Sequence, residues 1–314
     1  MNFKNKKVLV TGAYGFIGSH LIKKLMKDNA SIAVIVREHS NPWRVQEYLP
    51  HLKKYEANIQ SRTDICRIIH DFQPDYIFHL AAYGTDPNNR NNLLAFETNI
   101  LGTMNILFAA KDTNCQKIIC LGSSSEYGDK QELIHEKMLL EPIDIYGSTK
   151  AAATIISHQL AQEYKLPIIT LRAFNIFGEA EDSHKLFSHI IGKVLRGEPV
   201  KLTTCDQYRD YSYVGNIVDG LLLAATYEGN NNMILNIASG TARPLRNFVD
   251  LIYQYLDTEQ VPLYGAIPKR EHERNAPIPD ITKIQEVLNW TPAVSVEEGL
   301  KKTIAWYKSY HHFN

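Results

Sequence analysis

The amino-acid sequence predicts an α/β fold, with a doubly wound parallel sheet and a smaller C-terminal α/β lobe. In the first half of the chain, short apolar runs alternate with longer segments of helical periodicity, as in sheets whose strands are joined by crossover helices. The runs at 32–36 and 118–121 are apolar throughout, which is expected of strands that helices cover on both faces. A glycine-rich turn separates the first run from the first helical segment.

The elements follow in order along the chain. The expected strands are KKVLV at 6–10, SIAVIV at 31–36, YIFHLA at 76–81, KIICLG at 117–122 and PIITLR at 167–172. The expected helices are FIGSHLIKKLMK at 16–27, TDICRIIHDF at 63–72, LLAFETNILGTMNILFAA at 93–110 and a long helix from Tyr146 to about Tyr164. We therefore assign residues 1–171 to the sheet domain and 172–314 to the second lobe. Segments around 211–240 are expected to return to the main sheet.

Composition excludes several classes of partner. The 314 residues carry 34 basic and 34 acidic side chains, so no net charge attracts nucleic acid or an anionic membrane surface, and a small-molecule partner is favoured. No apolar run approaches the length of a membrane span, and the N-terminus shows no signal-peptide cleavage region, so we expect a cytoplasmic protein. Cys66, Cys115, Cys120 and Cys205 lack metal-ligand spacing, so neither a metal nor a disulfide is expected.

The first turn has the pattern of a dinucleotide site. VTGAYGFIGSHL places Gly12, Gly15 and Gly18 between a predicted strand and a predicted helix. Glycine lets the backbone approach a pyrophosphate closely, and the helix N-terminus offers unpaired N–H groups to anionic oxygen. The alternative is a turn with only a packing role. The position of the glycine motif in the first strand-turn-helix unit favours dinucleotide binding.

The end of the second predicted strand indicates the type of cofactor. An acidic residue there binds the ribose 2′-hydroxyl of NAD, whereas arginine suits the 2′-phosphate of NADP. VIVREHS offers Arg37, whose guanidinium can pair bidentately with phosphate. We therefore expect NADP, with NAD as the alternative because Glu38 is the next residue.

Tyr146 and Lys150 stand four residues apart in YGSTK, so a helix places both on one face. An ammonium about 4 Å from a phenol favours the phenolate by roughly 4 kcal/mol at an effective dielectric near 20, which lowers the phenol pKa by about 3 pH units. Such a tyrosine can exchange protons near neutrality. The same spacing also occurs on solvated helix faces, so the other motifs decide between the two interpretations.

Ordered motifs across nearly the whole chain support the catalytic interpretation. They are the glycine turn, HLAA at 79–82, ETNILGT at 97–103, GSSSEYG at 122–128, YGSTK at 146–150, LRAFNIFG at 171–178, YRDYSYV at 208–214, and LNWTP at 288–292 followed by EEGL. In this order they resemble the extended short-chain dehydrogenase/reductase family, which comprises sugar-nucleotide epimerases, dehydratases and ketoreductases. The resemblance implies a Rossmann-type sheet, a nicotinamide cofactor and a nucleotide-diphosphate sugar as the substrate.

The resemblance also implies roles for particular residues. Tyr146 would be the proton donor or acceptor, Lys150 would hold the nicotinamide ribose, and Ser123, four residues before the tyrosine of the YG pair, would complete the triad. Asn99 would support the active-site loops. The implied cofactor site comprises Gly12, Tyr14, Gly15, Phe16, Ile17, Gly18, Arg37, Asn58, Ile59, Leu80, Ala81, Ala82, Tyr146 and Lys150. The implied substrate contacts are Tyr83, Ser124, Ser125, Asn175, Arg209 and Arg274.

The serine cluster distinguishes members of the family. Dehydratases of this family carry Asp-Glu or Ser-Glu directly after the catalytic residue, whereas this chain has Ser124 and Ser125, and Glu126 comes one residue too late. The expected reaction is NADPH-dependent reduction of a nucleotide-linked 4-keto-6-deoxy sugar, with Tyr146 as proton donor. One alternative is a nucleotide-sugar 4-epimerase with tightly bound NAD, and another is a non-catalytic dinucleotide-binding protein. By resemblance we also expect a homodimer that pairs through the helices at 93–110 and 151–164.

Overall fold

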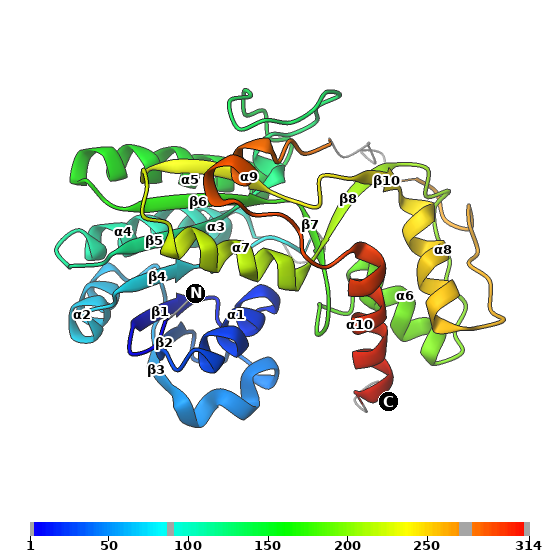
Figure 1. The fold of residues 1–314 in the computed structure, drawn as a ribbon, viewed down its shortest axis with the longest axis horizontal. Coiled ribbons are helices and arrows are strands. Elements are labelled where there is room, and N and C mark those ends of the chain that lie inside the picture. Colours follow the sequence, from blue (N-terminus) through cyan, green and yellow to red (C-terminus); the bar gives the residue numbers. More distant parts are fainter. Residues whose placement is uncertain (1–2, 87–90, 270–277, 311–314) are drawn as a thin grey trace.

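Seven parallel strands form the main sheet in the computed structural model, which describes residues 3–86, 91–269 and 278–310 (Figure 1). The order across the sheet is β3-β2-β1-β4-β5-β6-β9, so β9 returns to the sheet late in the chain. The strands are β1 (Lys7–Thr11), β2 (Ser31–Val36), β3 (Leu52–Glu56), β4 (Tyr76–His79), β5 (Lys117–Ser123), β6 (Ile168–Ala173) and β9 (Met233–Ile237). The predicted doubly wound parallel sheet is confirmed.

Helices cover both faces of this sheet. One face carries α2 (Arg62–Phe72), α3 (Asn92–Phe96), the π-helix η2 (Glu97–Gly102), α4 (Thr103–Ala110) and α5 (Ile145–Tyr164). The opposite face carries α1 (Phe16–Lys27), the 3₁₀ helix η1 (Trp43–His51) and α7 (Val214–Thr226). Val8 and Val10 of β1 point into the second of these layers, whereas Leu9 points into the first. All three side chains are fully buried, as the apolar strand sequences predict.

A smaller sheet organises the second lobe, to which β7 (Asn175–Phe177), β8 (Tyr208–Tyr213) and β10 (Ala242–Pro244) contribute. Figure 1 shows α6 (Leu186–Leu195), α8 (Leu245–Leu256) and α10 (Val296–Ser309) packed together at this end of the molecule. Their apolar faces form one core with β8. The short helix α9 (Thr282–Leu288) packs instead against β9 of the main sheet.

One described helical segment, Asn92–Ala110, is long and apolar enough to cross a membrane by length and composition alone. Half of its most apolar window is buried in the protein, as in a core helix. Its exposed apolar side chains are Leu93, Phe96 and Leu101, and Ile155 is exposed on α5. These are the two helices through which the family resemblance implies dimerisation, and the dimer stays a prediction.

Glu181 is a buried carboxyl group in the loop that leads to α6. Its side chain is 9% exposed, and its Oε2 has no hydrogen-bond partner among the described residues. Burial raises the pKa of Glu181 to about 8, because a poorly solvated site disfavours the carboxylate; the positive charge of Lys185 opposes this only in part. The folded protein therefore keeps this group protonated at neutral pH.

This burial predicts a pH-dependent stability. The unfolded chain releases the proton near the ordinary pKa of 4.5, whereas the folded chain holds it up to about pH 8, so stability falls as pH rises between these values. Glu181→Gln cannot ionise, so we expect it to exceed wild-type stability at pH 8 by a margin on the order of a few kcal/mol and to lose most of this advantage near pH 4.5. Thermal unfolding at both pH values measures the difference. Exposed Glu259→Gln is the control, and an equal gain at both pH values would contradict the assignment.

Candidate active site

The turn between β1 and α1 is shaped for close approach. Gly12 has φ +69°, and a Cβ there would lie 2.8 Å from the backbone nitrogen of Ala81. Gly18 packs directly against the carbonyl of Gly12. No side chain caps the first turn of α1, whereas Asp144 caps α5 by accepting a hydrogen bond from Gly147 N at 2.7 Å. The uncapped amides of α1 fit the pyrophosphate of a dinucleotide.

A cavity of about 460 Å³ lies against this turn. Ten of the predicted cofactor and substrate residues line it: Gly12, Tyr14, Gly15, Arg37, Asn58, Ile59, Leu80, Ala81, Ala82 and Tyr83. The other predicted cofactor residues, Phe16, Ile17, Gly18, Tyr146 and Lys150, do not line it. The Phe16 ring packs edge-on against His20, with 5.6 Å between the ring centroids, and Ile17 packs against the core. If Phe16 and Ile17 contribute to cofactor binding, they do so through the backbone amides of the first turn of α1.

The far end of the cavity follows β2. Arg37 is exposed and lines the cavity, whereas Glu38 is directed toward His39, with 3.9 Å between Oε2 and Nε2. No carboxylate is among the described residues that line the cavity. Arg37 therefore makes this end of the cavity cationic, and the choice between NADP and NAD stays a prediction.

The predicted triad lies at the carboxyl end of β5. Ser123 is the last residue of β5, and Lys150 of α5 donates from Nζ to the carbonyl of Leu121 at 2.6 Å. Lys150 is buried, which lowers its pKa, and the charge of Glu126 opposes this effect. Tyr146 lies in the first turn of α5 against Gly84, where a Cβ would be 3.6 Å from the tyrosine ring. Gly84 follows Tyr83, which lines the cofactor cavity, whereas Ser123, Tyr146 and Lys150 themselves do not line it.

Ser123 is oriented by its neighbours. Its Oγ accepts a hydrogen bond from Ser125 N at 3.1 Å, which leaves the hydroxyl proton available to a substrate oxygen. Ser124 and Ser125 lie in the 3₁₀ turn η3 (Ser124–Glu126), which packs against the start of α5. Glu126 closes the turn by accepting from Ser123 N, a role that the Ser-x-x-Glu capping-box pattern could have indicated.

Asn99 connects the loops around the triad, as the resemblance implied. Its side chain donates to Tyr83 O and to Thr149 Oγ1, both at 2.9 Å, and accepts from Tyr83 N at 2.8 Å. His79 lies beneath, hydrogen-bonded to Thr11 and Thr103, and burial lowers its pKa to about 3. It is therefore a neutral packing residue rather than an acid or base.

The predicted substrate residues of the second lobe fall partly together. Asn175 of β7 donates to the carbonyl of Asp210 at 2.8 Å, next to Arg209 on β8, so these two predicted contacts are neighbours. Neither lines the cofactor cavity. Arg274 lies outside the described residues. Asn216 of α7 binds both N and O of Val294 through its side-chain amide.

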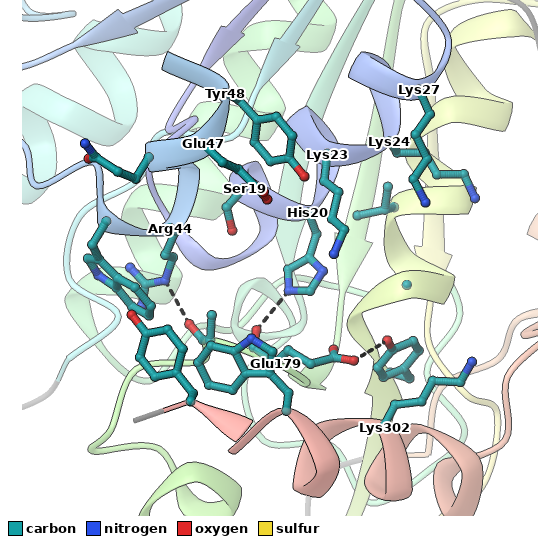
Figure 2. A pocket seen from close by; sticks show the side chains of 18 of the residues that line it. Ser19, His20, Lys23, Lys24, Lys27, Arg44, Glu47, Tyr48, Glu179 and Lys302 are labelled. Carbon is teal, nitrogen blue, oxygen red and sulfur yellow. Dashed lines mark hydrogen bonds between the residues drawn. The ribbon is translucent and has the colours of Figure 1, made fainter. Parts of the chain in front are cut away.

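A second cavity, of about 660 Å³, opens between α1, η1 and α10 (Figure 2). None of the triad residues lines it. Arg44 crosses one end by donating to Ala180 O at 2.8 Å and pairing with Asp182 at 2.6 Å, and His20 donates to Glu179 O at 2.9 Å. Arg44 also lines the cofactor cavity. The sequence analysis did not identify this link between the lobes, because its partners lie far along the chain.

The fold and the site together define a dinucleotide-binding α/β protein with a Ser-Tyr-Lys set. The chain belongs to the NAD dependent epimerase/dehydratase family, whose model matches residues 8–238, and this confirms the resemblance inferred from the motifs. It is similar to the UDP-glucuronate 4-epimerase of Thermodesulfobacterium geofontis, with 28% identity over 96% of this chain and 95% of that protein.

Solved structures of other proteins are also similar to this chain over nearly its whole length. The structure of Thermotoga maritima UDP-glucose 4-epimerase with UDP-glucose is 29% identical, with a TM-score of 0.88, over 96% of this chain and 99% of that one. That of Bacillus cereus UDP-glucuronic acid 4-epimerase in complex with NAD is 25% identical, with a TM-score of 0.84 and the same coverage of both chains.

The glycine turn predicts a specific loss of cofactor binding. In Gly12→Ala the new methyl group would collide with Leu80 and Ala81, which also line the cavity, so we expect cofactor affinity to fall about ten-fold or more. Gly197→Ala is the matched control, because Gly197 has a similar φ of +72° but open space around it. Calorimetric titration with NAD and NADP measures both variants. Equal affinity in the two would refute this role of the turn.

Proposed function

We propose that the protein is a nucleotide-sugar 4-epimerase that acts on a sugar linked to UDP or a similar nucleoside diphosphate. The observation that carries the proposal is the set of Ser123, Tyr146 and Lys150 at the carboxyl end of β5, with Tyr146 packed against Gly84, the residue after Tyr83 of the cavity wall. The similarity to 4-epimerases over nearly the whole chain supports the same reaction.

Each member of the triad has a defined part in this chemistry. Bound NAD would supply the acceptor and donor of the hydride. Tyr146 takes the proton from the sugar 4-hydroxyl and returns it to the 4-oxygen after the face of the sugar has changed. Ser123 donates a hydrogen bond to that oxygen, and Lys150 stabilises the phenolate by its charge. Because Lys150 is held on Leu121 O, its position is set before any ligand enters.

The serines after Ser123 argue against dehydration. Removal of water from a sugar needs a second acid and a base near carbons 5 and 6, and Ser124 and Ser125 supply neither. Glu126 follows them, but its carboxylate is fully buried and paired with Arg172, away from any substrate. Among Ser123, Ser124, Ser125 and Tyr146, Tyr146 is the titratable proton carrier, and one carrier suffices for oxidation and reduction at a single carbon.

The proposal predicts both a product and a bound cofactor. The substrate panel is UDP-glucose, UDP-glucuronic acid and UDP-N-acetylglucosamine, and proton NMR follows the reaction. We expect one of these substrates to equilibrate with its 4-epimer. We also expect denaturation of the purified protein to release NAD. Tyr146→Phe should lower turnover by about 100-fold or more but keep the cofactor. Tyr164→Phe, at the other end of α5, is the matched control. A protein that only binds dinucleotide would form no epimer and would be indifferent to Tyr146→Phe.

A second candidate is the NADPH-dependent 4-ketoreductase, which uses the same triad but releases its cofactor. One observation favours it: Arg37 lines the cavity and no described carboxylate does. In that reaction Tyr146 gives its proton to the 4-keto oxygen. Steady oxidation of added NADPH with a 4-keto-6-deoxy nucleotide sugar, without NAD in the purified protein, would decide for this candidate.

Arg37 predicts how the cofactors are distinguished. Arg37→Asp should weaken NADP binding by about ten-fold or more and leave NAD affinity nearly unchanged, because a charge-assisted bond to the 2′-phosphate is replaced by repulsion. Exposed Arg67→Ala, on α2 and paired with Asp64, is the control for loss of a surface arginine. Competition titrations with NAD and NADP measure the ratio. An unchanged ratio would exclude Arg37 as the discriminating residue.

A further inference from the structure

A buried ion pair lies directly behind the catalytic serine. Glu126 Oε2 and Arg172 Nε are 2.7 Å apart, and the two side chains are 0% and 2% exposed. The guanidinium lies over the ring of Tyr127, at 4.7 Å from its centroid, and the hydroxyl of Tyr127 donates to Asn236 Oδ1 at 2.6 Å. A buried pair of this kind adds little net stability compared with apolar residues of the same size, so stability alone does not account for it.

The pair is built into the end of β5. Glu126 Oε1 accepts a hydrogen bond from Ser123 N at 2.8 Å, so one carboxylate binds both Arg172 and the main chain of the serine. Gly122 leaves the room for this arrangement. A Cβ there would lie 2.8 Å from Glu126 Oε1 and 2.9 Å from Arg172 Cγ. The conformation of the strand end that carries Ser123 is therefore tied to the carboxylate.

The same carboxylate acts on the ammonium of the triad. Lys150 is buried, and its described hydrogen bond is to a neutral carbonyl, that of Leu121. Burial lowers the pKa of Lys150, and the negative charge of Glu126 is the largest opposing influence. A negative charge nearby favours the protonated form of a buried amine.

We propose that Glu126, held in place by Arg172, is a positioning residue for the reaction: it fixes the main chain of Ser123 and places a negative charge near Lys150. This inference rests on the proposed function, since it assumes that Ser123, Tyr146 and Lys150 carry the chemistry. It assigns to the Glu of GSSSEYG a part in catalysis although that side chain never reaches the substrate. It also gives a role to Gly122, where a Cβ would meet Glu126 Oε1, and to Arg172, which holds the carboxylate.

Charge removal tests the electrostatic half of the inference. Glu126→Gln keeps the shape and an acceptor for Ser123 N but leaves Arg172 as an uncompensated cation, so we expect the pKa of Tyr146 to fall by about one pH unit. The double variant Glu126→Gln, Arg172→Met removes both charges, so its Tyr146 pKa should lie close to that of the wild type. If the single substitutions acted only by damaging the structure, the double variant would instead show the sum of their effects. Exposed Glu132→Gln is the control and should leave the pKa of Tyr146 unchanged.

The readout needs no substrate. Phenolate absorbance is titrated for each variant and for the same variant with Tyr146→Phe, and the difference isolates Tyr146. An unchanged Tyr146 pKa in folded Glu126→Gln overturns the electrostatic half, whatever the outcome of the epimer assays. If no nucleotide sugar turns over but the shift occurs, the proposed function fails and the electrostatic coupling stands. Circular dichroism establishes that each variant is folded.

Glu126→Asp tests the positioning half and serves also if Glu126→Gln does not fold. It keeps the charge but is one methylene shorter, so it loses the bond to Ser123 N while the pKa of Tyr146 stays in place. We expect kcat to fall about ten-fold with KM nearly unchanged, because the hydrogen bond to the reacting oxygen is weakened most in the transition state. An unchanged kcat in this variant would overturn the positioning role, whether or not KM changes.

Discussion

The last three residues of β5 are the point on which the active site depends. Leu121 offers its carbonyl to the ammonium of Lys150, Gly122 leaves space for a buried ion pair, and Ser123 carries the hydroxyl. The strands of a parallel sheet all end at the same edge, so these groups and the glycine turn after β1 lie at one edge of the sheet. A buried ammonium is unfavourable unless polar groups compensate for the lost water, and here the Leu121 carbonyl and the Glu126 carboxylate do so. The contacts that hold Lys150 in the fold are therefore also those that set its charge.

The second lobe is tied to this edge by a few polar links. Arg44 and His20 reach from the sheet domain to the segment at 179–182, and Asn216 binds α7 to Val294. Asn175 and Arg209 lie on the separate small sheet of the second lobe. Arg44 also lines the cofactor cavity, so one side chain contacts both that cavity and the second lobe.

Sequence patterns predicted the strongly periodic elements well and the polar or short ones poorly. The expected helix at 16–27 and strand at 31–36 coincide with α1 and β2, since an unbroken apolar pattern allows one burial scheme. β3, with the sequence LKKYE, was not predicted because it is a partly exposed edge strand. The choice of Ser123 came from the family resemblance, in which the serine stands four residues before the tyrosine of the YG pair, and it stays a prediction. The sequence did not indicate that the Glu126 side chain pairs with Arg172. The two residues are 46 positions apart in the chain, and only the folded sheet brings them together.

Cofactor choice and reaction are set at separate places in this fold. The triad comes from β5 and α5, whereas the 2′-position of a cofactor ribose would meet the loop after β2. In the proposed reaction, a change in that loop would leave the proton chemistry of Tyr146 in place. Epimerase and reductase differ mainly in whether the cofactor leaves between turnovers. Trp43 and Arg44 of η1 line the cavity beside this loop.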